Sequence, residues 1–181
     1  MNQPPQSRPE RIARDLNALE CIGKEVGKAG VSRIAYTPAE NEAHIYVREQ
    51  MRNIGMETVV DGAGNLYGLL EGKDRSARHL AIGSHLDSVN EGGNFDGALG
   101  VVMGLEAARM LLPQGATLEL IAWRAEESAR FNTSCVGSKL ATGYLNAEKA
   151  KTLRDSNDIS IYDAIRSAGF NPDRISILDG S

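Results

Sequence analysis

The chain has 181 residues, of which 41% are hydrophobic and 24% charged, a composition typical of a globular domain and unlike that of disordered or fibrous proteins. Its formal net charge is −4 and its basic residues are scattered, which argues against a nucleic-acid partner. The first residues lack the apolar core of a signal peptide, and no stretch reaches membrane-spanning length. We therefore expect a cytoplasmic protein with no membrane partner.

Two helices are predicted near the start of the chain. Residues 1–8 are rich in proline and polar side chains and predict a flexible tail. Apolar residues then recur at helical spacing, at Ile12, Leu16, Leu19 and Ile22. A second helix is expected to begin in Thr37-Pro38-Ala39-Glu40, which matches a capping box, and to end at Gly55.

A β-hairpin and a β-α-β crossover are predicted next, which makes the chain an α/β protein. Turn-forming residues separate Glu57–Val60 from Asn65–Leu70, so these two segments predict a hairpin. Short apolar runs at His79–Gly83 and Leu118–Trp123 predict strands, and between them Ala98–Leu112 predicts a helix that ends at the following proline. This order predicts parallel strands joined by a right-handed connection. Further helices are predicted at Val136–Leu145 and Ile161–Ala168.

Polar side chains follow both crossover strands. His85 and Asp87 come after the first strand, Asp96 begins the crossover helix, and Glu126 and Glu127 come after the second strand. Ligands in open α/β sheets bind beyond the carboxyl ends of the strands, so we expect these five side chains to converge. Converging carboxylates repel one another unless a cation balances them. One imidazole with several carboxylates suits zinc, manganese, cobalt or nickel, and two ions ~3.5–4 Å apart can share one carboxylate.

Each of these features alone has a simpler interpretation. The pair Glu126 and Glu127 would more often be a solvated loop end, and a lone His85 more often a hydrogen-bonded histidine than a ligand. Their combination, directly after two buried strands, favours a functional site. Ser84 and its neighbours on one loop cannot adopt the geometry of a nucleophilic triad, and Cys135 has no evident base to activate it.

Two segments resemble the first metal motif of the hydantoinase/carbamoylase amidases. They are Gly83-Ser84-His85-Leu86-Asp87-Ser88-Val89 and Gly92-Gly93-Asn94-Phe95-Asp96-Gly97-Ala98-Leu99-Gly100-Val101. That family includes N-carbamoyl-L-amino-acid hydrolases, allantoate amidohydrolases and β-ureidopropionases, and is related to zinc aminopeptidases and aminoacylases. The segment after Glu126 and Glu127 departs from the family pattern, because Ser128 stands where the family usually has glycine.

The resemblance implies a fold and a set of roles. The fold is a three-layer α/β/α domain with a mixed, largely parallel sheet, of which residues 9–181 form the N-terminal part. His85, Asp96 and Glu127 bind two divalent metal ions, Zn²⁺ or Mn²⁺ with Co²⁺ or Ni²⁺ as alternatives, and Asp96 bridges them. Asp87 orients His85, and Glu126 is the general base. A metal-activated water, deprotonated by Glu126, would then attack the carbamoyl carbon of a small carbamoyl or ureido substrate.

The resemblance also implies parts that lie downstream in the family. These are two further metal-binding histidines, a dimerisation domain with the substrate-carboxylate contacts, and the rest of the sheet. We therefore expect a homodimer for the full-length form and no activity for this chain alone, and the substrate-binding residues stay unknown. Two other interpretations remain open: a non-catalytic α/β module that serves assembly, and a metallopeptidase or deacylase of the related branch.

Overall fold

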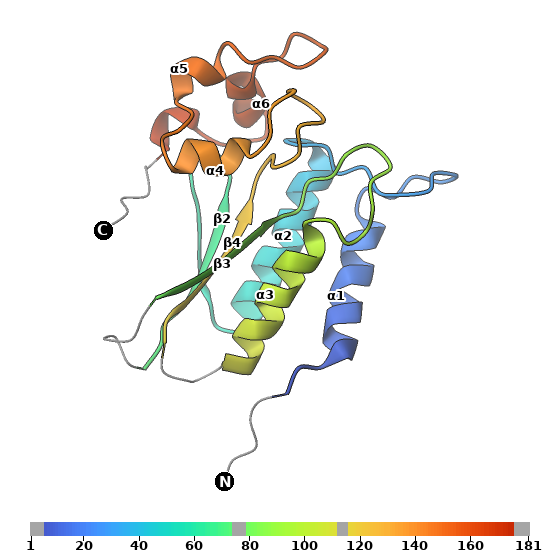
Figure 1. Cartoon of the computed structure of the whole chain (residues 1–181), viewed down its shortest axis with the longest axis vertical. Coiled ribbons are helices and arrows are strands. Elements are labelled where there is room, and N and C mark those ends of the chain that lie inside the picture. The colour runs from blue at the N-terminus through green and yellow to red at the C-terminus, as the bar shows by residue number, and fades with distance from the viewer. Residues whose placement is uncertain (1–5, 74–78, 112–115, 176–181) are drawn as a thin grey trace.

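A mixed four-stranded sheet with helices forms the protein (Figure 1). The computed structural model describes residues 6–73, 79–111 and 116–175. In chain order the elements are α1 (Pro9–Cys21), α2 (Pro38–Asn53), β1 (Glu57–Val60), β2 (Leu66–Leu70), β3 (Leu80–His85), α3 (Ala98–Leu111), β4 (Leu118–Trp123), α4 (Val136–Ala141), α5 (Ala147–Ala150), α6 (Ile161–Ser167) and a 3₁₀ turn, η1 (Pro172–Arg174).

The sheet has the strand order β1-β2-β4-β3. Strand β3 pairs parallel with β4, with Leu80 opposite Leu118 and His85 opposite Trp123, which confirms the predicted parallel crossover pair. The β1–β2 and β2–β4 pairs are antiparallel, so the described part of the sheet is mixed but not largely parallel as expected. The hairpin explains part of this difference, because a short turn between β1 and β2 can only reverse the chain direction.

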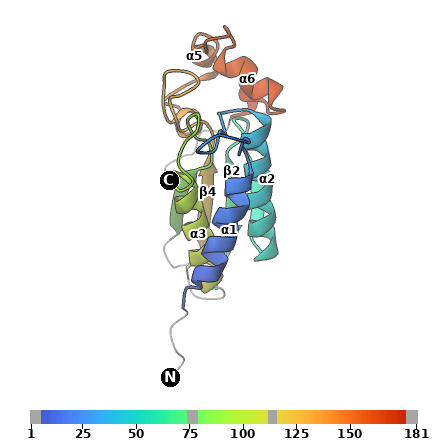
Figure 2. The same ribbon diagram turned by 90° about the vertical axis from the view of Figure 1, so that its right-hand side faces the viewer.

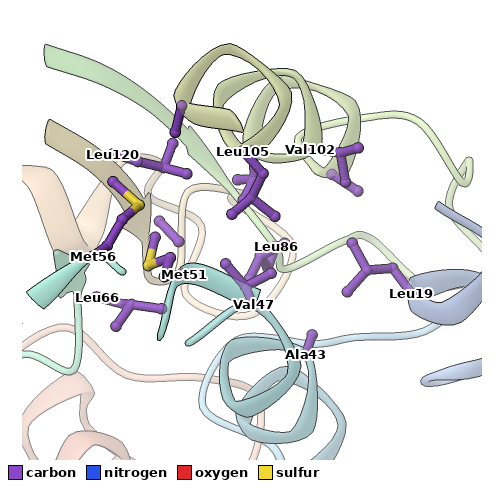
Figure 3. Packing of buried hydrophobic residues seen from close by; sticks show 14 of the residues in the cluster. Leu19, Ala43, Val47, Met51, Met56, Leu66, Leu86, Val102, Leu105 and Leu120 are labelled. Atoms are coloured by element: carbon purple, nitrogen blue, oxygen red, sulfur yellow. The ribbon is translucent and has the colours of Figure 1, made fainter. Parts of the chain in front are cut away.

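Helices α2 and α3 pack on one face of the sheet, and α1 packs against α3, farther from the strands (Figures 1 and 2). Alternation along the strands points Leu66 and Leu120 toward this face, where they pack with Met51 of α2 and Leu105 of α3 in one buried cluster (Figure 3). Val59, which alternation directs to the opposite face, is 65% exposed. The described residues thus supply the sheet and one helical layer of the three layers expected.

A second buried cluster joins α4 and α6 to the loops beyond β4. It contains Phe131, Val136, Leu140, Ile161 and Ile165, among others. The helix predicted over residues 136–145 is shorter than expected and ends at Ala141, and Gly143 follows with a left-handed φ of 75°. The short elements α5 and η1 were not predicted. The predicted end of α3 at Leu112 and the proline after it lie outside the described residues.

The start of α2 differs from the predicted capping box. Thr37 is the N-cap residue, but its hydroxyl donates to the carbonyl of Ile34 and does not accept an amide of the helix. Glu40 does reach back, to the N–H of Tyr36 at 2.6 Å and not to that of Thr37. At the other end, Gly55 has the expected left-handed backbone, with φ of 83°.

Buried ion pairs hold α1 against α3. Glu106 of α3, whose side chain is 1% exposed, accepts from the guanidinium of Arg11 at 2.6 Å and from the backbone N–H of Arg8 at 2.8 Å. Asp15 of α1, fully buried, accepts from Arg109 of α3 at 2.6 Å. None of the helices in the described ranges has the length and apolar character needed to cross a membrane.

Candidate functional site

The predicted convergence takes place at the carboxyl ends of β3 and β4. His85 is the last residue of β3, and its Nδ1 lies 3.1 Å from the backbone carbonyl of Asp87 and 3.4 Å from the carboxylate of the same residue. Both partners are acceptors, so the proton of the neutral imidazole belongs on Nδ1. The lone pair of Nε2 then faces Asp96 Oδ1 and Glu126 Oε2, each 3.7 Å away.

Asp87 has a second function that the sequence did not indicate. Its carboxylate is fully buried and accepts the backbone N–H groups of Glu126 at 3.0 Å and Glu127 at 2.9 Å. These are the first two acids after β4, so Asp87 holds the backbone of both glutamates as well as the ring of His85. Hydrogen bonds of this kind to a carboxylate are among the stronger ones in proteins.

A buried pair on the far side of the same loop was also missed. Glu40 Oε1 accepts the N–H of Ala125 at 3.1 Å, and its Oε2 accepts Arg124 Nη1 at 3.0 Å. Glu40 is fully buried and Arg124 is 3% exposed. The loop that holds Glu126 is thus fixed between Glu40 of α2 and Asp87. The only sequence signal was the capping-box pattern, which predicted for Glu40 a local role at the start of the helix and no contact with a distant loop.

The pKa values of His85 and Glu127 are both raised at this edge of the sheet. Burial lowers the pKa of His85, but the hydrogen bond and charge of Asp87 and the charge of Glu126 outweigh it, and the net pKa is raised. Burial and then the negative charge of Asp96 raise the pKa of Glu127. The other four predicted side chains thus all act on the charge of Glu127, while Asp96 keeps 71% of its side chain exposed.

The spacing of two donor atoms fits a divalent cation, but the described residues do not form a complete ligand group. Two ligand atoms on one tetrahedral ion with bonds of ~2.1 Å lie about 3.4 Å apart, close to the 3.7 Å between His85 Nε2 and Asp96 Oδ1. Within residues 6–73, 79–111 and 116–175, however, no group of three or more His, Cys, Asp or Glu side chains is arranged to hold an ion. The ligand assignment of His85, Asp96 and Glu127 stays a prediction.

Glycine gives the site its close packing. Gly97 has a left-handed φ of 65°, and a Cβ there would lie 2.5 Å from the His85 ring. The chain can therefore pass directly over the imidazole only because residue 97 has no side chain. This places Asp96 beside His85, as the motif predicted.

Comparisons with known proteins found a matching family and several relatives. The profile described as peptidase family M28 matches residues 65–174. The chain is 39% identical over 170 residues to an N-carbamoyl-L-amino acid amidohydrolase of Geobacillus stearothermophilus, covering 92% of this chain and 41% of the relative. It is 36% identical to an allantoate amidohydrolase of Bacillus subtilis, covering 78% of this chain and 35% of the relative.

A solved structure shares the fold. It is a hydantoinase/carbamoylase family amidase from Burkholderia ambifaria, with a TM-score of 0.87 and 32% identity, covering 98% of this chain and 44% of that one. This chain spans about 41% of the length of the Geobacillus relative. The profile match shows that the chain belongs to peptidase family M28, and the identities and the shared fold show that it is similar to the hydantoinase/carbamoylase amidases.

Proposed function

We propose that the protein containing this chain is a metal-dependent amidohydrolase that cleaves the carbamoyl or ureido C–N bond of a small substrate. The observation that supports this most is the meeting of His85 Nε2 with the carboxylates of Asp96 and Glu126 at the carboxyl ends of two parallel strands. The named activities of the two relatives supply the bond type, because both act on carbamoyl or ureido compounds.

In this proposal His85, Asp96 and Glu127 would hold divalent metal, Zn²⁺ or Mn²⁺. The metal would supply a positive charge that polarises the carbonyl and stabilises the developing oxyanion. Among the described residues no three such side chains are arranged to hold an ion, and the proposal takes the further ligands to be the two downstream histidines that the family resemblance implies. The homodimer is likewise a proposal that follows from family resemblance, and the cytoplasmic location is a proposal that follows from the sequence expectation.

The residues of this chain perform the proton transfers. Asp87 fixes the Nδ1–H tautomer of His85 and, through two backbone amides, the position of the loop after β4. The Glu126 carboxylate accepts a proton from the attacking water and delivers it to the leaving nitrogen. Water adds to the carbamoyl carbon, the C–N bond breaks to release the amine, and the carbamate product decomposes to ammonia and carbon dioxide.

A substrate panel tests the proposal. The protein is assayed in Mn²⁺ or Zn²⁺ with N-carbamoyl amino acids, allantoate, ureidopropionate and dipeptides, alone and mixed with a polypeptide that supplies the remainder of a family member. We expect ureido hydrolysis only in the completed protein, because positioning of substrate and water accounts for ~7–11 kcal/mol of such barriers. Glu126→Gln should lower turnover by ~10²–10⁴ and keep its metal, whereas Glu127→Gln should lose metal first. Equal metal loss in both variants would contradict this division of roles.

A peptidase is the second candidate, and the name of the matching family favours it. The same panel distinguishes the two. Hydrolysis of dipeptides with no turnover of carbamoyl compounds would assign the peptidase function, and no turnover of any substrate by the completed protein would favour a non-catalytic module.

A further inference from the structure

The carboxylate of Glu126 has a hydrogen-bond partner that no role has yet explained. The thiol of Cys135 lies 3.1 Å from Glu126 Oε1 and donates to it. No other hydrogen bond to this carboxylate is present in the part of the chain that the structure describes. We propose that Cys135 is a positioning residue that selects the orientation of the Glu126 carboxylate. This inference rests on the proposed function, in which Glu126 is the base.

The two carboxylate oxygens of Glu126 face different neighbours. Oε1 accepts the thiol proton, and Oε2 lies 3.7 Å from His85 Nε2, on the side where a water must be deprotonated. Without a donor at Oε1, the side chain, which is 34% exposed, could rotate into solvent. A thiol is a weak donor, and this one is the only hydrogen-bond donor to the carboxylate among the described residues.

The backbone places Cys135 beside Glu126 by a short ladder of hydrogen bonds. Three successive amides, beginning with that of Cys135, donate to the carbonyls of Glu126 and of the two residues before it, at 2.7, 2.9 and 2.9 Å. Gly137 provides the last of these amides, and a Cβ there would lie 2.5 Å from the carbonyl oxygen of Arg124. Three hydrogen bonds therefore hold residues 124–126 and 135–137 side by side.

Backbone strain is concentrated in the same loop. Cys135 has a left-handed φ of 56°, and so do two other residues with side chains, Ala125 at 50° and Asn132 at 53°. Left-handed conformations cost energy for residues with a Cβ and persist where the surrounding structure enforces them. At Cys135 this conformation turns the thiol back toward Glu126.

The protonation state of the thiol agrees with its role as a donor. The hydrogen bond to Glu126, followed by burial, raises the pKa of Cys135. A thiol with a raised pKa keeps its proton at neutral pH, and it is a poor nucleophile for the same reason. The sequence showed no base that would activate Cys135 as a nucleophile, and in the structure its thiol donates to the Glu126 carboxylate.

An NMR measurement that needs no catalysis tests this inference. In protein labelled with ¹³C-glutamate, the Glu126 resonance is assigned by its loss in Glu126→Gln, and its rotamer populations are measured from side-chain couplings. We expect one rotamer in the wild type and in Cys135→Ser, which keeps a donor, and averaged rotamers in Cys135→Ala. Cys21→Ala, at an exposed cysteine, is the matched control and should resemble the wild type. An unchanged rotamer in Cys135→Ala, or averaging in Cys135→Ser, would overturn the proposal.

Kinetics in the completed enzyme provide a second readout. Cys135→Ala should lower kcat by roughly 10- to 100-fold with little change in KM, because the base is misplaced while substrate contacts remain, and Cys135→Ser should restore most of the rate. An unchanged kcat in Cys135→Ala would refute the role. If the wild type hydrolyses nothing, the proposed function fails, and the NMR result still decides this inference.

A spectroscopic comparison covers the case in which Cys135→Ala does not fold. The S–H stretching band of Cys135, distinguished from that of Cys21 by Cys21→Ala, should move to higher frequency in Glu126→Gln, since a neutral amide accepts more weakly than a carboxylate. A band that does not move would show that the thiol does not bond to Glu126.

Discussion

Replacing Arg124 with methionine should destabilise the protein by leaving Glu40 buried without its cation. The two side chains are 4% and 0% exposed, and their closest atoms are 3.0 Å apart. Methionine fills most of the space of the arginine stem, so the loss of charge dominates over the loss of volume. Removing one member of a buried pair costs ~3–5 kcal/mol, because the remaining charge is left uncompensated.

The structure places the expected cost at the lower end of that range. Glu40 keeps the amides of Tyr36 and Ala125 as donors after the substitution, so its carboxylate is not wholly unpartnered. We therefore expect about 3 kcal/mol. For a chain of this length ~2–4 °C of melting temperature corresponds to each kcal/mol, which gives a decrease of roughly 6–12 °C by circular dichroism. Arg52→Met, at an exposed arginine, is the matched control and should change little.

The pH dependence of this penalty has a defined sign. Burial raises the pKa of Glu40 and Arg124 opposes that increase, so removal of Arg124 raises the pKa further. A carboxyl group whose folded pKa is raised lowers stability as pH rises through that pKa. The penalty of Arg124→Met should therefore be full at neutral pH and smaller in mildly acidic buffer, where Glu40 takes up a proton. A penalty that grows in acid, or one as small as that of Arg52→Met, would refute the reasoning.

Three further predictions concern other parts of the molecule. His85→Ala should weaken binding of Zn²⁺ or Mn²⁺ in titration calorimetry, and unchanged binding would make the ligand assignment wrong. Burial tends to raise the pKa of Glu106, but hydrogen bonds from Arg11 and the Arg8 backbone lower it overall. The Glu106 carboxylate therefore stabilises the fold above the unfolded pKa of ~4.3, and this stabilisation is lost as pH falls through the folded pKa. The difference in urea midpoint between wild type and Glu106→Gln should accordingly vanish in acid. Gly137→Ala, whose Cβ would lie 2.5 Å from a backbone oxygen, should cost ~1–3 kcal/mol, whereas Gly93→Ala, with nothing within 4 Å, should cost little.

Local patterns were sufficient to predict most of the fold. Strand β4 was predicted with its observed bounds, and β1 likewise, because turn residues and apolar runs mark strand ends directly. The parallel pairing of β3 with β4 followed from the intervening helix. The antiparallel pairing of β2 with β4 could not be predicted, because it depends on which strand the hairpin lies beside, and no local residue records that choice.

The site was predictable where it depends on chain order. His85, Asp96 and Glu126 meet because His85 ends β3, Asp96 comes just before α3 and Glu126 comes just after β4. The supporting contacts were not predictable. The bond from Cys135 to Glu126 depends on a left-handed backbone at a non-glycine residue, and the burial of Glu40 depends on how α2 packs against the loop after β4. Both are set by tertiary packing and not by spacing.

The several bonds to Asp87 have a mechanical consequence. This one carboxylate holds the backbone after β4, and its residue holds the imidazole at the end of β3. Any sliding of the two strands past one another would have to break these bonds, so thermal motion at this edge displaces the imidazole and both glutamates together. Fluctuations of the sheet should therefore change the distances between the imidazole and the two glutamates very little. Substitutions that loosen the distant end of β3 should leave these distances intact.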